Sequence, residues 1–373
     1  MAEQTTANGT GDLPREQVVI IGSGPAGWTA AVYAARAGLE PLVYPGRAAG
    51  KDLAPGGQLM FTTDVENYPG FPNAVTGPEM MHMFYHQAMK FGTRVVTDKG
   101  VMNMDELPNE TLYQNFQNVE SVDLSERPFR VKGDCAGGGY EVLADAVIIA
   151  TGAKANWLGL ENETRLAQSG GGVSACAVCD GALPMFRDAV LGVVGGGDTA
   201  VEEATYLSKF ASKVLMFVRR DELRASKIMA QRALDNPKIE VVWNTSITDV
   251  LGDDKVTGVK VINNQTKEES EIELGGLFLA IGHTPITGFL NGQLPADDNG
   301  YLLLKDPYKS TTEIEGVFLA GDVADHVYRQ AVTAAGMGCK AAIDAERWLA
   351  EQEGGEEPEG ESSTAAELSG AGN

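Results

Sequence analysis

The sequence predicts an α/β fold with two Rossmann-like nucleotide-binding domains, the second inserted into a discontinuous first domain. Two observations predict this arrangement. The order of apolar strand, glycine-rich turn and helix occurs twice, with the two turns about 170 residues apart. Apolar strands that end in glycine stand before and after the second copy, at residues 146–152 and 277–282, where the chain would cross between the domains.

The first copy consists of a strand at residues 17–21, the turn GSGPAG at 22–27, an alanine-rich helix and a second strand at 40–44. In such a turn the first glycine permits the tight bend, the second lets the backbone approach a pyrophosphate, and the third lets helix and strand pack closely. These positions are held by Gly22, Gly24 and Gly27. The phosphates would then lie at the helix N-terminus, where free N–H groups favour negative charge.

The second copy has a strand at residues 189–194, the turn GGGDTA at 195–200, a helix from residue 201 and a returning strand at 212–218. Gly195, Gly197 and Ala200 fit the variant of the turn that ends in alanine. Two such turns, each between a strand and a helix, indicate two nucleotide sites.

The two crossings and a late strand at residues 316–322 define the predicted domain division. This late strand is expected to rejoin the first domain. The division is a flexible leader at 1–15, the first domain at 16–152 and 282–350, the inserted domain at 153–281, and an acidic, disordered tail at 351–373. The tail has seven glutamates and neither lysine nor arginine.

The ends of the second strands indicate which nucleotide each domain prefers. An aspartate or glutamate usually stands there to bind the ribose, but the first domain has Tyr44 and Pro45. The second domain instead has Arg219 and Arg220, followed by Arg224. Because guanidinium groups pair well with a phosphate dianion, this site favours the 2′-phosphate of NADPH over NADH.

Two of the four cysteines, Cys176 and Cys179, have the spacing C-x-x-C and are followed at once by Asp180. Such a pair can form a structural disulfide, provide half of a zinc site or work as a redox dithiol. A structural zinc needs four ligands, and the sequence has no second C-x-x-C. A stable disulfide is disfavoured in a reducing cytosol, so the redox reading is preferred. Asp180 could supply the proton for thiol–disulfide exchange, or simply cap a turn.

Composition narrows the range of partners. The formal net charge of −23 would repel nucleic acid and anionic lipid. No run of 18 apolar residues predicts a membrane span, and the polar N-terminus does not resemble a secretory signal, so a cytoplasmic protein is expected. His82 and His86 could share a helix face, but without a third ligand no metal site is predicted.

Seven motifs in order resemble those of the low-molecular-weight thioredoxin reductases. They lie at residues 22–27, 55–59, 66–72, 174–181, 195–200, 219–228 and 321–331. The resemblance runs from about residue 16 to about residue 350. It implies an enzyme that passes electrons from NADPH through FAD and the cysteine pair to thioredoxin.

The resemblance also implies site residues. FAD would be held by Gly22, Ser23, Gly24, Pro25, Ala26, Gly27, Gly57, Gln58, Asn67, Asp322, Arg329, Gln330 and Ala331. NADPH would be held by Gly195, Gly197, Asp198, Thr199, Ala200, Arg219, Arg220 and Arg224. Cys179 would face the flavin, Cys176 would attack the partner's disulfide, and Asp180 would be the acid. The family is homodimeric and rotates its inserted domain between two poses.

Three features depart from the family pattern. Val218 stands where a histidine usually precedes the paired arginines, Tyr44 and Pro45 replace one ribose contact, and residues 102–117 look like an insertion. Two other functions stay open. One is a related flavin disulfide reductase with a different electron donor or protein partner, and the other is a flavin redox sensor that does not turn over.

Overall fold

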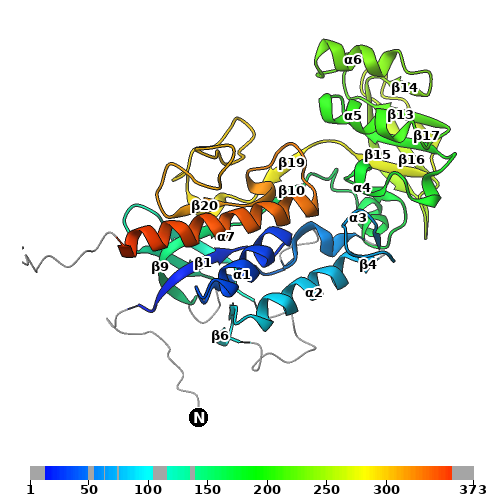
Figure 1. Cartoon of the computed structure of the whole chain (residues 1–373). Coiled ribbons are helices and arrows are strands. Elements are labelled where there is room, and N and C mark those ends of the chain that lie inside the picture. The colour runs from blue at the N-terminus through cyan, green and yellow to red at the C-terminus, as the bar shows by residue number, and fades with distance from the viewer. Residues whose placement is uncertain are drawn as a thin grey trace, which may run out of the picture.

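The structure is a computed structural model that describes residues 13–48, 54–62, 64–73, 75–103, 116–134 and 139–354. It has two lobes, each built on its own sheet (Figure 1). The sheet of the first domain takes strands from both ends of the chain, whereas the five-stranded sheet takes strands only from the middle. The predicted fold, with one nucleotide-binding domain inserted into another, is therefore confirmed.

The sheet of the first domain has the order β6-β5-β2-β1-β9-β8-β7, with β20 paired to β9. Its strands are β1 (Arg15–Ile21), β2 (Leu42–Tyr44), β5 (Arg94–Thr97), β6 (Gly100–Met102), β7 (Val119–Asp123), β8 (Phe129–Gly133), β9 (Glu141–Ile149) and β20 (Val317–Leu319). At its centre β1 pairs in parallel with β2 and β9. The strand β2 begins two residues later than predicted, because Glu40 has a positive φ and Pro41 has no N–H to donate.

Among the described residues, three helices cover this sheet: α1 (Pro25–Arg36), α2 (Gly77–Lys90) and α7 (Ala331–Gly354). Helices α1 and α7 run side by side (Figure 1). Trp28 on α1 meets Tyr85 on α2 edge to face, with ring centroids 5.2 Å apart. Short elements complete the domain: η1 (Gly57–Phe61), β3 (Asp64–Val65), β4 (Val75–Thr76), η4 (Gly288–Leu290) and η5 (Gly321–Val323).

The inserted domain has a five-stranded parallel sheet in the order β11-β18-β12-β13-β14. Its strands are β11 (Val173–Ser174), β12 (Val190–Val194), β13 (Lys213–Phe217), β14 (Ile239–Val242) and β18 (Gly276–Leu279). A three-stranded antiparallel sheet of β15 (Thr245–Leu251), β16 (Gly258–Asn263) and β17 (Glu269–Glu273) lies beside it. The helical elements are α3 (Glu161–Gln168), α4 (Ala177–Asp180), η3 (Pro184–Phe186), α5 (Asp198–Leu207) and α6 (Lys227–Leu234).

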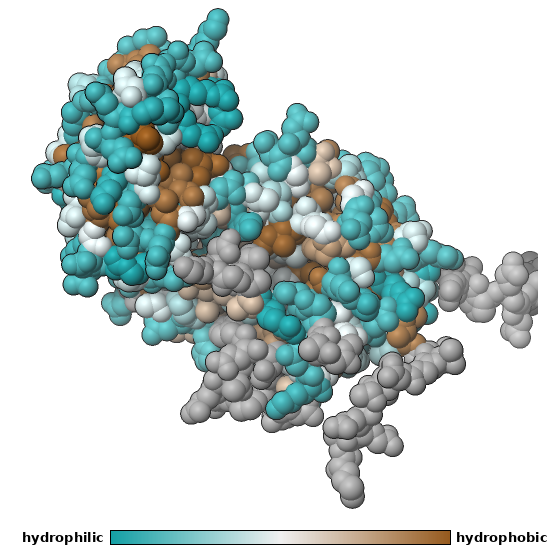
Figure 2. Space-filling model, turned by 180° about the vertical axis from the view of Figure 1, so that it is seen from behind, coloured by the Kyte–Doolittle hydropathy of each residue, from teal (hydrophilic) through white to brown (hydrophobic). Residues whose placement is uncertain are grey.

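The two domains are joined by an antiparallel pair of short strands, β10 (Ala153–Ala155) and β19 (His283–Pro285). Side chains reinforce this ribbon. Thr151 Oγ1 donates to the carbonyl of Ile286 at 2.7 Å, and Thr284 Oγ1 donates to Asn156 Oδ1 at 2.8 Å. In the space-filling view the lobes are separate masses, with apolar side chains gathered on the inserted lobe beside the junction (Figure 2).

One predicted boundary is wrong by four residues, because α7 continues to Gly354 whereas the tail was expected from residue 351. The helix is anchored shortly before this point by Leu349, which is buried, and by Trp348, which packs on Phe318. Helix propagation through the following residues then adds one bond per residue. The rest of the tail, residues 1–12 of the leader, most of the predicted insertion and Cys135 lie outside the described residues. None of the described helices combines the length and apolar character needed to cross a membrane.

Candidate functional site

The first glycine turn has the geometry of a phosphate-binding turn. Gly22 has a φ of +116°, and a Cβ there would lie 2.2 Å from the carbonyl oxygen of Ala150. A Cβ on Gly27 would lie 2.1 Å from the oxygen of Gly22. By contrast, a Cβ on Gly24 would meet nothing closer than 3.8 Å. The outer glycines are therefore required by packing, and Gly24 leaves the helix N-terminus open to a ligand.

The second turn repeats this division of roles. Gly195 has a φ of +143°, and a Cβ there would lie 2.5 Å from the oxygen of Ala280, whereas Gly197 faces open space. Asp198 ties the turn to the segment that carries the arginines, because its carboxylate accepts the backbone N–H of Ser226 at 2.8 Å. The predicted phosphate ligands Arg219, Arg220 and Arg224 are exposed in this segment.

A cavity of about 890 Å³ begins at the first turn and reaches the inserted domain. The predicted residues that line it are Gly22, Ser23, Gly24, Pro25, Ala26, Gly57, Gln58, Asn67, Cys176, Cys179, Asp180, Thr199, Asp322, Arg329, Gln330 and Ala331. Those that do not line it are Gly27, Gly195, Gly197, Asp198, Ala200, Arg219, Arg220 and Arg224. The structure thus brings the first turn and the cysteine pair to one cavity and leaves most of the second turn outside it.

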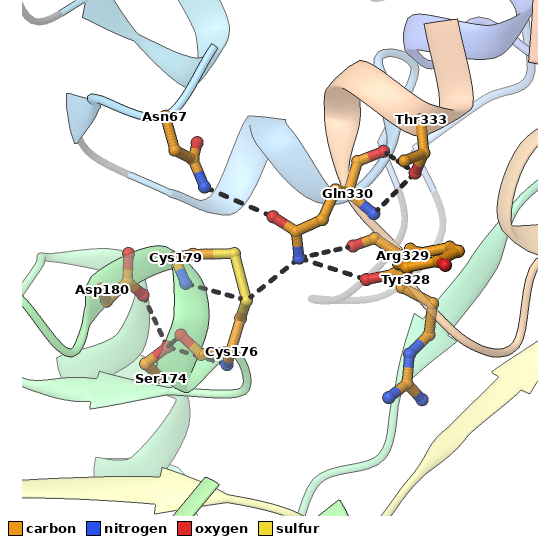
Figure 3. The surroundings of a disulfide bond; sticks show 9 residues. All are labelled: Asn67, Ser174, Cys176, Cys179, Asp180, Tyr328, Arg329, Gln330 and Thr333. Carbon is orange, nitrogen blue, oxygen red and sulfur yellow. Dashed lines mark hydrogen bonds between the residues drawn. A yellow bond between two sulfur atoms is a disulfide. The ribbon is translucent and has the colours of Figure 1, made fainter. Parts of the chain in front are cut away.

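Cys176 and Cys179 form a disulfide at the start of α4 (Figure 3). The backbone N–H of Cys179 donates to Cys176 Sγ at 3.2 Å. From the first domain, Gln330 Nε2 approaches the same sulfur at 3.9 Å, and Gln330 Oε1 accepts from Asn67 Nδ2 at 3.3 Å. Residues that the sequence places 154 positions apart, Cys176 and Gln330, therefore meet across the domain boundary.

Asp180 is linked to the cysteine pair through Ser174. The Ser174 hydroxyl donates to Asp180 Oδ2 at 2.5 Å, and Ser174 Oγ accepts the backbone N–H of Cys176 at 3.0 Å. Burial raises the pKa of Asp180, and the hydrogen bond from Ser174 lowers it in part. A carboxyl group with a raised pKa beside a disulfide can hold a proton and release it to a thiolate.

Asp322 presents an unpaired acceptor to the cavity. It follows β20 in η5, and its Oδ1 is buried without a hydrogen-bond partner among the described residues. Burial, with a contribution from Asp325, raises the pKa of Asp322 to about 7. A buried polar atom without a partner is costly, so the site calls for a ligand that offers a donor. The hydroxyl-bearing chain of a flavin dinucleotide has such donors, and the residues present therefore fit this group.

Sequence reasoning missed Glu203, which lines the cavity from α5. Burial raises the pKa of Glu203 to about 8, despite the nearby charge of Arg329 and a hydrogen bond from the backbone of Ala177. The available signal was helical spacing. Residues 200, 204 and 207 form the buried face of α5, and position 203 belongs to the same face.

His283 is a second residue whose contacts the sequence did not indicate. It lies on β19, and its Nδ1 is 3.1 Å from Arg329 Nη1. Burial, together with the charge of Arg329, lowers the pKa of His283 to about 4. Arg329 itself has a φ of +48°, a backbone conformation rare for residues other than glycine, and it lines the cavity.

The described part of the chain has no cluster of three or more His, Cys, Asp or Glu side chains that could hold a metal ion. His82 and His86 do share a face of α2, with Nε2 atoms 2.7 Å apart. Burial, together with His82, lowers the pKa of His86 and so favours the neutral form of its imidazole.

Comparisons with known proteins agree with this geometry. The family described as pyridine nucleotide-disulphide oxidoreductase matches residues 16–338. A thioredoxin reductase of Dictyostelium discoideum is 49% identical over 334 residues, which cover 90% of this chain and 97% of that protein. A thioredoxin reductase of Rickettsia conorii is 48% identical over 336 residues, which cover 89% of this chain and 98% of that protein.

Solved structures give the same result. The thioredoxin reductase of Giardia duodenalis has a TM-score of 0.79 at 43% identity and covers 90% of this chain and 99% of that one. The enzyme of Streptococcus pyogenes has a TM-score of 0.76 at 38% identity, with coverage of 91% and 100%. With two glycine turns, a disulfide at a shared cavity and matches over nine-tenths of its length, the chain belongs to the pyridine nucleotide-disulphide oxidoreductase family.

Proposed function

We propose that this chain is a thioredoxin reductase that uses FAD and NADPH to reduce the disulfide of a thioredoxin. The observation that carries the proposal is the Cys176–Cys179 disulfide, which lies against the cavity that begins at the first glycine turn. Relatives of nearly the same length with this function are close to half identical to the chain.

FAD would occupy the first domain. Gly22 and Gly24 would receive its pyrophosphate at the N-terminus of α1, with Gly27 allowing the turn to pack closely, and Asp322 Oδ1, which has no partner among the described residues, would accept from a hydroxyl group. When bound, FAD supplies a two-electron carrier between a nicotinamide and a disulfide. Gln58, Asn67 and Gln330 would position the ring, since all three line the cavity and Gln330 also approaches Cys176 Sγ.

The cysteine pair would be reduced and then oxidised in each cycle. Reduction breaks the S–S bond with two electrons and two protons and yields two thiols. The thiolate of Cys176 would attack a sulfur of thioredoxin's disulfide to form a mixed disulfide, which Cys179 would then resolve. The N–H of Cys179 favours the thiolate at Cys176, and Asp180 would exchange the proton through its position beside Ser174.

NADPH would bind at the second turn. Gly197 faces open space there, and Arg219, Arg220 and Arg224 would pair with the 2′-phosphate. The departure at Val218 leaves these arginines in place, because the Val218 side chain is buried beneath Gly196. The inserted domain would have to rotate about the β10–β19 ribbon, since the disulfide lines the cavity in this pose and Gly195 and Gly197 do not.

We also propose a cytoplasmic homodimer that has no nucleic acid or membrane partner. A reducing compartment suits a disulfide that is opened in every cycle, and the net charge of −23 opposes binding to polyanions. Light scattering of the purified chain would give the mass. A value of one chain would reject the dimer.

The function is tested with the purified full chain, NADPH and a panel of thioredoxins, with thiol formation as the readout. We expect NADPH to bleach the flavin spectrum and thioredoxin to be reduced. In a Cys179→Ser variant, NADPH should still bleach the flavin spectrum, but thioredoxin should not be reduced. The control Cys339→Ser, a change of the same kind on α7, should behave as wild type. Failure with every thioredoxin removes the proposed substrate, and full turnover by Cys179→Ser removes the proposed mechanism.

A further inference from the structure

The first domain lacks the acid that usually binds ribose at the end of the second strand. In this chain β2 ends at Tyr44 and is followed by Pro45 and Gly46. Pro45 has no polar side chain, and its carbonyl oxygen already accepts the Ser23 hydroxyl. A dinucleotide bound at the first turn would still present an adenosine ribose here, because Pro45 and Gly46 line the same cavity as Gly22 and Gly24.

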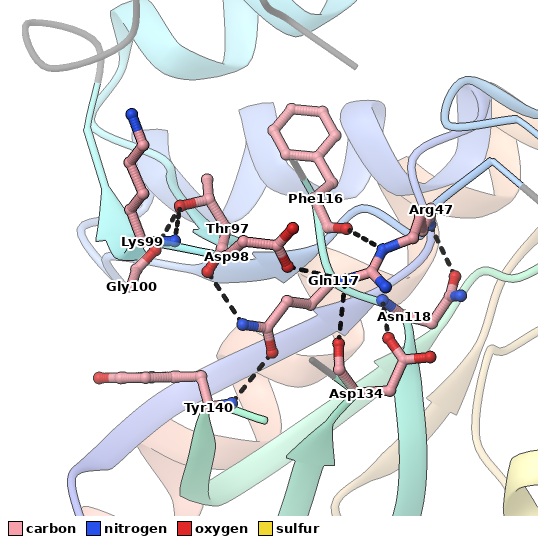
Figure 4. A network of polar contacts seen from close by, with 10 residues as sticks. All are labelled: Arg47, Thr97, Asp98, Lys99, Gly100, Phe116, Gln117, Asn118, Asp134 and Tyr140. Carbon is pink, nitrogen blue, oxygen red and sulfur yellow. Dashed lines mark hydrogen bonds and ion pairs between the residues drawn. The ribbon is translucent and has the colours of Figure 1, made fainter. Parts of the chain in front are cut away.

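A polar network occupies this end of the cavity (Figure 4). Arg47 is at its centre. The Arg47 guanidinium donates to Asp98 at 2.7 Å and to the carbonyl oxygen of Asp134 at 3.3 Å, and its backbone N–H donates to Asn118 Oδ1 at 2.6 Å. The charge of Arg47 is therefore already paired, and its role is to fix the segments that contain Asn118 and Asp134.

Asp134 is held from several sides but keeps one acceptor. Its backbone N–H donates to the carbonyl of Asn118 at 3.0 Å, and its Oδ1 accepts the N–H of Asn118 at 3.1 Å. Within the residues that the structure describes, Oδ2 has no hydrogen-bond partner, and Asp134 lines the cavity beside Pro45 and Asn118. A carboxylate oxygen that is fixed in place and still free is the acceptor that ribose hydroxyls need.

We propose that Asp134 takes the place of the missing strand-end acid and accepts a hydrogen bond from the 2′-hydroxyl of the adenosine ribose of FAD. Arg47 and Asn118 are positioning residues that hold Asp134. This inference rests on the proposed binding of FAD to the first domain. It moves ribose recognition from the end of β2 to the end of β8, two strands that the order of the sheet keeps apart.

The test compares FAD with its analogue that has 2′-deoxyadenosine, in wild type and in Asp134→Ala. The apoprotein of the full chain is titrated with each flavin, and quenching of flavin fluorescence gives the dissociation constants. In wild type, we expect the deoxy analogue to bind about 10- to 100-fold more weakly, the range for a hydrogen bond to a charged group. In Asp134→Ala the two flavins should have equal dissociation constants, and the affinity for FAD should fall by the same factor that separates the two flavins in wild type.

Two further variants keep the test decisive. Asp134→Asn retains the size of the side chain and the acceptor for Asn118, so it should fold normally. The ratio of the dissociation constants of the two flavins should nevertheless be smaller in this variant than in wild type. Asp123→Ala removes an exposed carboxylate from the neighbouring strand β7 and should leave both constants unchanged. The temperature at which the holoenzyme releases fluorescent flavin provides a second readout.

Each result has one meaning. If Asp134→Ala weakens the binding of both flavins but keeps the wild-type ratio of their dissociation constants, Asp134 only supports the fold and the proposal is wrong. If the variant binds both with wild-type affinity, the proposal is also wrong. If wild type itself binds no FAD, the proposed function fails instead, so the two failures are distinguishable.

Discussion

Helix α7 crosses α1 at a glycine, and replacing this glycine should disturb both the core and the cavity. A Cβ on Gly338 would lie 2.1 Å from the carbonyl oxygen of Ala26 and 2.9 Å from its carbonyl carbon. Both atoms belong to the backbone, so no change of rotamer can relieve the contact. Ala26 lies in the first turn of α1 and lines the cavity, and a shift of α1 away from α7 would therefore move the phosphate-binding turn.

The same helix contains a matched control. Gly336 stands two residues earlier, is exposed, and would place a Cβ within 4 Å of nothing. Alanine is favoured over glycine inside a helix by about 1 kcal/mol, so Gly336→Ala should be neutral or slightly stabilising. Overpacking of a closed interface costs about 1–3 kcal/mol or more. Since the gain in helix propensity is common to both changes, Gly338→Ala should be less stable than Gly336→Ala by about 2 kcal/mol.

Two measurements check this expectation. Denaturant unfolding of the holoenzyme gives the difference in stability, and absorbance gives the flavin retained after purification. We expect Gly338→Ala to unfold at lower denaturant and to lose flavin, and Gly336→Ala to match wild type in both. If Gly338→Ala retains full flavin and the stability of Gly336→Ala, the close contact of α1 with α7 is not tight and the reasoning is refuted.

Three further predictions concern two acids that line the cavity, Glu203 and Asp180, and the arginines near the second glycine turn. Burial raises the pKa of Glu203 from 4.5 to about 8 in the folded state, so the folded chain holds this proton more tightly than the unfolded chain does. The resulting contribution to stability is complete below about pH 4.5 and is lost as the pH rises through 8. Unfolding of Glu203→Gln should therefore depend less on pH between 5 and 8 than unfolding of wild type, and parallel curves would contradict the assignment. Asp180→Asn should keep flavin bleaching by NADPH and slow thioredoxin reduction about 100-fold, as stopped-flow kinetics would show; an unchanged rate would exclude Asp180 as the acid. Replacing Arg219 and Arg220 by alanine should raise the KM for NADPH at least about tenfold and leave that for NADH unchanged, and an equal effect on both would place the 2′-phosphate elsewhere.

The sequence was sufficient for the parts of the site that are local along the chain. Both glycine turns follow from a strand, a helix and the steric limits on three positions, and the structure has Gly22 and Gly195 in the required backbone conformation. The pairing of Cys176 with Cys179 is equally local. The insertion of one domain into the other could be predicted because strands that end in glycine mark both crossings.

Contacts between distant segments could not be predicted in this way. Gln330 meets Cys176 across 154 positions, and Arg329 meets His283 across 46. The first pair depends on how the two domains are oriented, and the second on where the β10–β19 ribbon lies against the first domain, and no local pattern encodes either. Glu203 is the intermediate case, since helical spacing places it on the buried face of α5 but only the structure shows that this face meets the cavity.

The acids around the cavity also change how the charge of the chain should be interpreted. The formal charge of −23 counts every carboxyl group as ionised, and such a charge would oppose the binding of two dinucleotides that carry phosphates. However, burial raises the pKa of Asp322 to about 7 and that of Glu203 to about 8, and it also raises that of Asp180. A large share of the Asp322 and Glu203 carboxyl groups is therefore protonated near neutral pH, and the cavity is less negative than its composition suggests. The phosphates would meet backbone N–H groups at the two helix N-termini, where negative charge is favoured.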